Sequence, residues 1–249
     1  MLVTASDSTL ENTPALEISD LQAWYGESHV LHGVDMLVQP GEVVTLLGRN
    51  GAGRTTTLRS IMGLGGRRTG SIKVYGQETI AMPTYRIAHC GIGYCPEERG
   101  IFASLTCEEN LLLPPRLKGT EQTGAGMPLD EIYDMFPNLA ERRHSPGTRL
   151  SGGEQQMLAV ARILRTGARL LLLDEISEGL APVIVQALAR MIVTLRSRGY
   201  TIVMVEQNFR FAAPLADRFY VMEHGRIAMQ FVAAQLEAKR ATLDALLNV

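Results

Sequence analysis

Cysteine is scarce in this sequence. The 249 residues contain only three cysteines, Cys90, Cys95 and Cys107. They form an odd set, and their spacing lacks the CxxC pairs or histidine partners of a zinc site. We therefore expect them to be packing residues in a reducing compartment.

Long apolar runs are also missing. No stretch approaches the ~20 residues that a membrane-spanning helix needs. Residues 1–15 form a polar leader without the cationic start and apolar stretch of a signal peptide. These absences predict a cytosolic protein that reaches a membrane only through a partner.

Neither sign of charge dominates. The 24 basic and 26 acidic side chains leave a net charge of -2, and the basic pairs at 67–68 and 142–143 are too short to form a patch. Such a balance gives no electrostatic footprint for DNA or RNA, so we expect no nucleic-acid partner. The length and the 46% hydrophobic content instead predict one α/β domain with a smaller lobe.

Strand and helix patterns alternate along most of the chain. This alternation predicts an α/β fold with a mainly parallel core sheet, an N-terminal antiparallel β part and a smaller helical lobe. The expected strands are 16–25, 30–38, 42–47, 70–75, 92–95, 169–174, 200–206 and the hairpin 219–223/226–231. The expected helices are 54–62, 129–136, 153–164, 182–198 and a weak amphipathic helix near the end, with 119–128 as a flexible connector.

These patterns divide the chain into five parts. They are the leader (1–15), a phosphate-binding α/β part (16–97), the helical lobe (98–164), the rest of the α/β core (165–231) and a C-terminal helix (232–249).

A glycine-rich loop follows the third expected strand. The run GRNGAGRTT matches the P-loop pattern G-x-x-x-x-G-K-[ST], except that Arg54 replaces the lysine. Backbone N–H groups and the start of the next helix can surround phosphate oxygens, and the Thr55 hydroxyl can ligate Mg²⁺. Arg54 keeps the positive charge in a bulkier, forked group, so we expect nucleotide binding to persist and hydrolysis to be less certain. A glycine-rich turn without a ligand is the alternative. The candidate phosphate-binding residues are Gly48, Asn50, Gly51, Ala52, Gly53, Arg54, Thr55 and Thr56.

Two carboxylates end the apolar run RLLLLDE. Asp174 is placed to bind a metal ion, and Glu175 to act as general base or to position an attacking water. Arg54 and Glu175 are thus candidate catalytic residues. A strand that merely ends in acidic residues is the alternative.

A second candidate phosphate surface is the run LSGGE at 150–154. Ser151 is a good helix N-cap, and Gly152 and Gly153 leave backbone N–H groups open to an anion. With these motifs in this order, the chain resembles the ABC ATPase family, whose signature is LSGGQ; Glu154 is the departure. A capped helix without ligand is the alternative.

The resemblance implies a mechanism that needs two subunits. In the family, the signature of one subunit covers the γ-phosphate of the MgATP held by the P-loop of the other. We therefore expect ATP and Mg²⁺ as ligands, and a head-to-tail dimer of this chain with itself or with a sister ATPase.

Smaller motifs extend the resemblance from about residue 16 to residue 231. Tyr25 corresponds to the aromatic residue that stacks on adenine, although a core tyrosine at a strand end is the alternative. Glu97 occupies the place of the Q-loop glutamine and could still reach the Mg²⁺ shell. The segment 177–180 corresponds to the D-loop at the dimer interface. Gln207 replaces the switch histidine and is the third candidate catalytic residue. Its amide can bond the γ-phosphate but cannot carry a proton, so proton transfer would depend on Glu175.

The runs GIGYCPEERGIFASLTCEENLLLPP, LLLDEISEGLAPVIV and VEQNFRFA are similar to the LivF-type ATPases of branched-chain amino-acid importers. This resemblance implies two membrane permeases, two ATPases on the cytoplasmic face of the membrane and a periplasmic binding protein. The segment 98–115 would meet the permease through Ile101, Phe102 and Leu105, unless these side chains are core. Open alternatives are an importer of urea, amides or aromatic carboxylates, a soluble non-transport ABC ATPase, and a non-catalytic nucleotide sensor.

Overall fold

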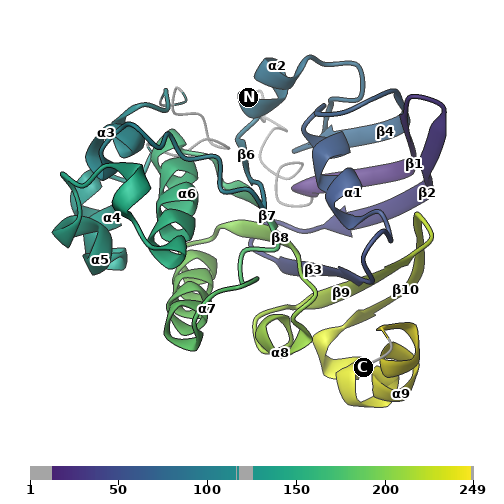
Figure 1. The fold of residues 1–249 in the computed structure, drawn as a ribbon. Coiled ribbons are helices and arrows are strands. Elements are labelled where there is room, and N and C mark those ends of the chain that lie inside the picture. The colour runs from purple at the N-terminus through teal and green to yellow at the C-terminus, as the bar shows by residue number, and fades with distance from the viewer. Residues whose placement is uncertain (1–12, 116, 118–125, 248–249) are drawn as a thin grey trace, which may run out of the picture.

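Two β-sheets form the framework of the protein (Figure 1). This computed structural model describes residues 13–115, 117 and 126–247, so most of the predicted leader and of the predicted connector lies outside the described residues. The smaller sheet is antiparallel, in the order β2-β1-β4-β5. Its strands are β1 (Leu16–Tyr25), β2 (Ser28–Val38), β4 (Arg68–Val74) and β5 (Gln77–Glu78).

The larger sheet has six strands in the order β10-β9-β3-β8-β7-β6. All neighbours in it are parallel except the β9–β10 pair, which forms the predicted hairpin. The mainly parallel core sheet and the antiparallel N-terminal part are therefore confirmed. The strands of this larger sheet are β3 (Val43–Gly48), β6 (Ile92–Cys95), β7 (Leu170–Asp174), β8 (Thr201–Val205), β9 (Arg218–Glu223) and β10 (Arg226–Val232).

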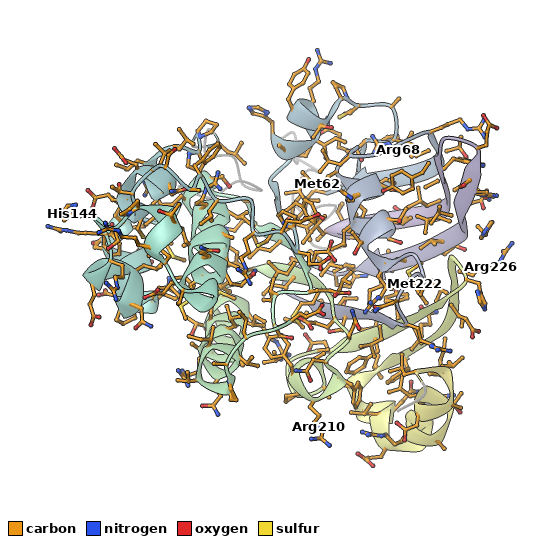
Figure 2. The ribbon with its side chains drawn as sticks, viewed as in Figure 1. Met62, Arg68, His144, Arg210, Met222 and Arg226 are labelled. Carbon is orange, nitrogen blue, oxygen red and sulfur yellow. The ribbon has the colours of Figure 1, made fainter. Side chains whose placement is uncertain are left out.

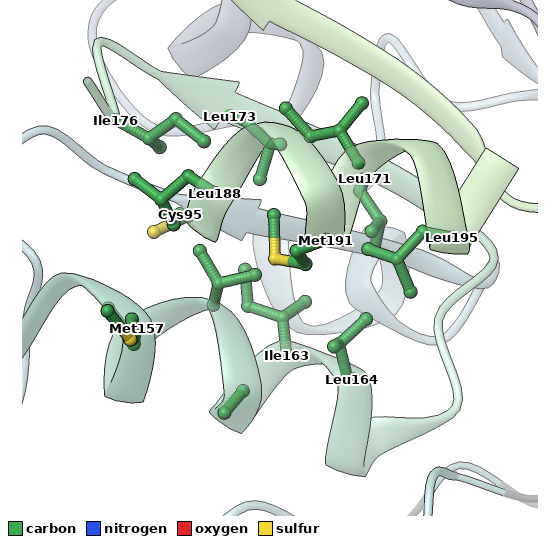
Figure 3. Close-up of a cluster of buried hydrophobic side chains, with 14 of the residues drawn as sticks. Cys95, Met157, Ile163, Leu164, Leu171, Leu173, Ile176, Leu188, Met191 and Leu195 are labelled. Carbon is green, nitrogen blue, oxygen red and sulfur yellow. The ribbon is translucent and has the colours of Figure 1, made fainter. Parts of the chain in front are cut away.

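Helices cover both faces of the larger sheet, which explains why its central strands are apolar throughout. Leu171 and Leu173 of β7 pack on one face against α6 (Gly152–Thr166) and α7 (Pro182–Ser197), as Figure 3 shows. Leu170 and Leu172 point to the other face. There they share a cluster with α1 (Arg54–Ile61), which lies between the two sheets.

Polar contacts also connect α1 to the antiparallel sheet. Arg68 of β4, labelled in Figure 2, donates to the backbone carbonyl oxygens of Ser60, Thr79 and Met82. One carbonyl group near the end of α1 and two of a connecting segment thus share one guanidinium as donor, and burial is the main cause that lowers the pKa of this guanidinium. This contact ties the end of α1 to the antiparallel sheet.

Between residues 98 and 166 the described structure consists of helices joined by loops, without a strand of either sheet. The helices α3 (Cys107–Leu112), α4 (Leu129–Met135) and α5 (Pro137–Glu141) join α6 to form the lobe at the left of Figure 1. The sequence patterns did not predict α3 and α5, nor α2 (Thr84–Ala88), α8 (Phe209–Ala212) and the two-residue strand β5. Two short 3-10 turns, Gly147–Arg149 and Ala233–Gln235, precede α6 and α9 (Leu236–Leu247). The five-part division of the chain stays a prediction.

Most predicted elements are confirmed, with small shifts at their ends. Among the strands, the largest shifts are at β2 and β4, which each begin two residues before the predicted start, at Ser28 and Arg68. The C-terminal helix α9 buries only Leu243 completely, in agreement with its weak pattern. None of the described helices is long and apolar enough to cross a membrane.

The three cysteines are free thiols. Cys95 and Cys107 are buried in the apolar cluster beneath α6, and Cys90 is half-buried. Burial raises the pKa of Cys107 to about 11, which keeps its thiol protonated and unreactive. The expectation of packing residues is confirmed for these two buried cysteines.

Candidate functional site

The glycine-rich loop joins the buried strand β3 to α1. Gly51 and Gly53 have φ angles of +79° and +106°, where a side chain would be strained. A Cβ on Gly53 would also lie 2.8 Å from Cδ2 of Leu31. Within the described chain no side chain caps the start of α1, so its first N–H groups are open to an anion. The loop therefore has the backbone of a phosphate site.

Arg54, the residue that departs from the P-loop pattern, is buried at the start of α1. Its Nη2 donates to Oε1 of Glu175 over 2.7 Å and to Oδ1 of Asn50 over 3.3 Å. Its Nη1 is buried without a hydrogen-bond partner among the described residues. Burial lowers the pKa of Arg54, although Glu175 opposes the shift, and a guanidinium stays charged in any case. One donor of the guanidinium is thus unused beside the loop.

Glu175 is held at both carboxylate oxygens. Arg54 binds Oε1, and Nε2 of Gln207 donates to Oε2 over 2.8 Å. The backbone of Glu175 has a φ of +48°, which is uncommon for a residue with a side chain and persists only where neighbours hold it. Three predicted catalytic residues from distant parts of the chain therefore meet at one point.

A separate pair of bonds fixes Asp174. The Thr55 hydroxyl donates to its Oδ1 over 3.0 Å, and the Tyr94 hydroxyl donates to its Oδ2 over 2.9 Å. Burial raises the pKa of Asp174, and these two hydrogen bonds oppose the shift. A carboxylate beside a hydroxyl suits a hard cation such as Mg²⁺.

Glu97 lies in a different group of oxygens. One carboxylate oxygen from each of Glu97, Glu175 and Glu178 lies within 4.8 Å of the others. The structure thus brings Glu97 to Glu175, the predicted catalytic carboxylate. Hydrogen bonding to Glu175, together with burial and like charge, raises the pKa of Glu178 to about 7.

The signature run forms a capped helix start. The Ser151 hydroxyl accepts from the N–H of Glu154 over 3.3 Å, and the Glu154 carboxylate accepts from the N–H of Ser151 over 2.7 Å. Glu154, the departure from LSGGQ, thus completes a capping box. Because α6 and α1 cover opposite faces of the larger sheet, the signature and the P-loop of one chain lie in different parts of the molecule.

Tyr25 ends β1 with 40% of its surface exposed. The alternative of a core tyrosine is therefore wrong. Its ring lies beside Gly65, where an added Cβ would be 3.4 Å from the tyrosine hydroxyl. An exposed ring at a strand end remains available for stacking.

Two residues of this site, Tyr94 and Glu178, were not predicted from the sequence. Tyr94 lies on β6, which pairs in parallel with β7, so its hydroxyl reaches the end of that strand. The rule that parallel strands end at the same edge was the available signal. Glu178 lies within the predicted D-loop and carried no separate signal.

Comparison with known proteins shows the family of this chain. The family described as ABC transporter matches residues 31–178. The chain belongs to the ABC transporter family.

Two relatives align with most of this chain. The branched-chain amino acid transport ATP-binding protein BraG of Pseudomonas aeruginosa is 41% identical over 94% of this chain and 99% of its own length. The probable branched-chain amino acid transport ATP-binding protein LivF of Archaeoglobus fulgidus is 36% identical over 87% of this chain and 91% of its own length.

The fold is that of an ABC cassette. A crystal structure of a nucleotide-free ATP-binding cassette from an ABC transporter superposes with a TM-score of 0.80 at 20% identity, covering 95% of this chain and 99% of that one. The predicted ABC cassette fold and the recognised family are therefore confirmed. The roles of the individual site residues stay predictions.

Proposed function

We propose that this chain is the ATP-hydrolysing subunit of an ABC importer for branched-chain or other hydrophobic amino acids. The observation that carries the hydrolytic activity is the convergence of Arg54 and Gln207 on the two oxygens of Glu175. The amino-acid class is supported by the two relatives, which match this chain along almost their whole length.

The phosphate chain of ATP would bind along the loop between β3 and α1. The unused Nη1 of Arg54 is a donor for a phosphate oxygen, and a phosphate there would compete with Glu175 for the guanidinium. Glu175 would then be free to orient the attacking water and accept its proton, with the Gln207 amide bonded to the γ-phosphate. Tyr25 would stack on adenine.

Thr55 and Asp174 are the residues that would hold Mg²⁺, because their oxygens already lie 3.0 Å apart. The ion supplies charge neutralisation at the β- and γ-phosphates when bound. Glu97 is the third candidate ligand, on the side of the site that also contains Glu175.

The working form would be a head-to-tail dimer of this chain with itself or with a sister ATPase. Within one chain the signature and the P-loop helix cover opposite faces of the larger sheet. A second subunit could bring Ser151, Gly152, Gly153 and Glu154 to the γ-phosphate, where the start of α6 offers backbone N–H groups.

A groove of about 410 Å³ between β6, α6 and the segment after α3 is the proposed permease surface. Its lining is mostly apolar and includes Ile92, Ile163, Pro114 and Pro115. Of the candidate permease contacts, Ile101 packs against the core, whereas Phe102 is exposed with the Arg162 guanidinium over its ring. Bound there to permeases, the chain would work on the cytoplasmic face of the membrane, with a periplasmic binding protein delivering the substrate.

The first test is Mg²⁺-dependent ATP hydrolysis by the purified chain and by Glu175→Gln. We expect the variant to lose about 100-fold or more in kcat, since a general base contributes on that order, and to form an ATP-bound dimer visible by light scattering. Glu237→Gln, an exposed change on α9, is the control and should match the wild type. ATP binding without hydrolysis by the wild type would contradict a self-sufficient motor and favour a sensor or an obligate heterodimer.

Substrate choice is tested in proteoliposomes that contain this chain, its permeases and its binding protein. We expect ATP-dependent uptake of labelled leucine that unlabelled isoleucine and valine reduce. Uptake of urea, an amide or an aromatic carboxylate in place of leucine would establish the alternative importer.

A further inference from the structure

Glu206 is a buried carboxylate that the proposed mechanism does not use. It follows β8 and is 1% exposed. Its Oε1 accepts from the backbone N–H of Ser177 over 3.2 Å, and its Oε2 accepts from the Ser177 hydroxyl over 2.8 Å. Ser177, which is itself buried, opens the predicted D-loop. A single carboxylate therefore binds one residue twice.

The residues on either side of Glu206 bind the same segment. The Val205 carbonyl oxygen accepts from the N–H of Glu175 over 2.9 Å, and the Gln207 amide donates to the Glu175 side chain over 2.8 Å. Three consecutive residues at the end of β8 thus hold both ends of the segment 175–177. This arrangement follows from the parallel pairing of β7 and β8, whose partners Asp174 and Val205 bring the two strand ends together.

The segment 175–177 needs such support. Glu175 is held at a left-handed φ of +48°, a conformation that costs free energy in a residue with a Cβ. If Ser177 were released, the segment could relax, and the Glu175 carboxylate would leave its position between Arg54 and Gln207.

If Glu206 only filled space between β8 and Ser177, an ionisable side chain would be an unfavourable choice. Burying a carboxylate carries a desolvation cost that hydrogen bonds only partly offset. Glutamine has nearly the same shape, but with its one acceptor oxygen it keeps both contacts only if the Ser177 hydroxyl turns to accept from its NH₂ group. The carboxylate accepts from both donors of Ser177 as they stand.

We propose that Glu206 is a positioning residue for ATP hydrolysis, which by binding both donors of Ser177 holds the backbone of Glu175 so that its carboxylate stays in place. This inference rests on the proposed ATPase function for its kinetic consequence. Glu206 acts through Ser177 and Glu175 and contacts no phosphate.

The test compares Glu206→Met, Ser177→Ala and the double variant with the wild type in steady-state ATP hydrolysis at pH 8, where the Glu206 carboxylate is ionised. We expect each single variant to lose about tenfold in kcat, the effect of one or two charged hydrogen bonds, with KM for ATP within about twofold. The double variant should lose little more than either single variant, because both changes break the same contact. Asn208→Ala is the control: it removes the cap of α8 next to Glu206 but touches nothing in segment 175–177.

A second measurement does not depend on activity. Amide hydrogen exchange in the nucleotide-free chain should become faster in the peptide that covers 175–180 in both single variants and stay unchanged in Asn208→Ala. Unchanged exchange there, or a wild-type kcat in Glu206→Met, would overturn the inference. So would a kcat loss that Asn208→Ala shares equally. A wild type without ATPase activity would instead refute the proposed function, and exchange alone would then decide the role of Glu206.

Discussion

Arg54 shows how one substitution in a motif can be accommodated by its surroundings. Lysine and arginine both carry a positive charge, but arginine presents several donors in a fixed plane. Here one donor group, Nη2, binds Glu175 and Asn50, whereas Nη1 has no partner among the described residues. The geometry allows arginine to contact a phosphate and a protein oxygen together, which a single ammonium does less well.

Replacing Arg54 by lysine or by alanine tests separately whether its positive charge or its planar shape is needed. We expect Arg54→Lys to keep MgATP binding and a turnover equal to or above that of the wild type, because the ammonium can still reach the phosphates. Arg54→Ala should lower the free energy of unfolding by about 3 kcal/mol in urea titrations, since it leaves the buried Glu175 carboxylate without its cation. Loss of hydrolysis in Arg54→Lys would show that the planar guanidinium itself is required.

Glu206 should make stability depend on pH. Burial raises its pKa from 4.5 to about 7, so between these values the folded chain keeps a proton that the unfolded chain has lost. The free energy of unfolding should therefore fall as pH rises from about 4.5 to 7, by about 3 kcal/mol at about 1.4 kcal/mol per pKa unit. Urea titrations at pH 5 and pH 8 should show a smaller loss in Glu206→Gln than in the wild type and in Glu237→Gln, because the raised pKa values of Glu178 and Asp174 remain in all three chains. Equal pH dependence in all three chains would contradict the assignment.

At the scale of elements, the sequence predicted those helices and strands that have a clear local periodicity. Apolar runs and glycine ends sufficed for β3, β7 and the helix that follows the P-loop. The short helix α3 was missed because its six residues show little periodicity, although Thr106 and Glu109 form a capping box that could have revealed it. The contacts Tyr94–Asp174 and Ser177–Glu206 depend on which strands are neighbours, and no local pattern contains that information.

The signature glycines illustrate a second limit. Both were interpreted as openings for an anion, yet only Gly153 is also demanded by packing: a Cβ there would lie 2.7 Å from Cγ1 of Ile184 on α7. A Cβ on Gly152 would meet only the end of the flexible Arg99 side chain, at 3.3 Å. Packing therefore requires glycine at position 153 but not at position 152.

This difference predicts unequal effects of alanine at the two positions. Gly153→Ala should lower the free energy of unfolding by about 2 kcal/mol, the usual cost of an overpacked contact, because α7 must move away from α6. Gly152→Ala should stay within about 0.5 kcal/mol of the wild type, since a helical alanine offsets a small shift of Arg99. Thermal unfolding of the two variants provides the measurement, and equal destabilisation would show that the packing contact is not the cause.

At the scale of the whole molecule, the two faces of the larger sheet separate the two phosphate-binding surfaces. The P-loop helix α1 lies between the sheets, whereas α6 packs with α7 on the opposite face (Figures 1 and 3). In the proposed dimer, a cyclic pairing of two chains would supply each P-loop with the signature of its partner. Catalysis by one chain alone would then be impossible, however complete its own motifs are.

Mixing two inactive variants tests this arrangement directly. Thr55→Ala removes a proposed Mg²⁺ ligand but leaves the signature intact, and Ser151→Arg blocks the signature but leaves the P-loop intact. Each homodimer then has two defective sites, whereas a mixed dimer has one site built from the intact P-loop of one chain and the intact signature of the other. An equimolar mixture should recover about a quarter of the wild-type ATPase activity, because half of the dimers are mixed and each has one of two sites intact. Recovery should rise with protein concentration, as dimerisation requires. If the mixture stayed as inactive as its components while the wild type hydrolysed ATP, each chain would complete its own site and the head-to-tail dimer would be wrong.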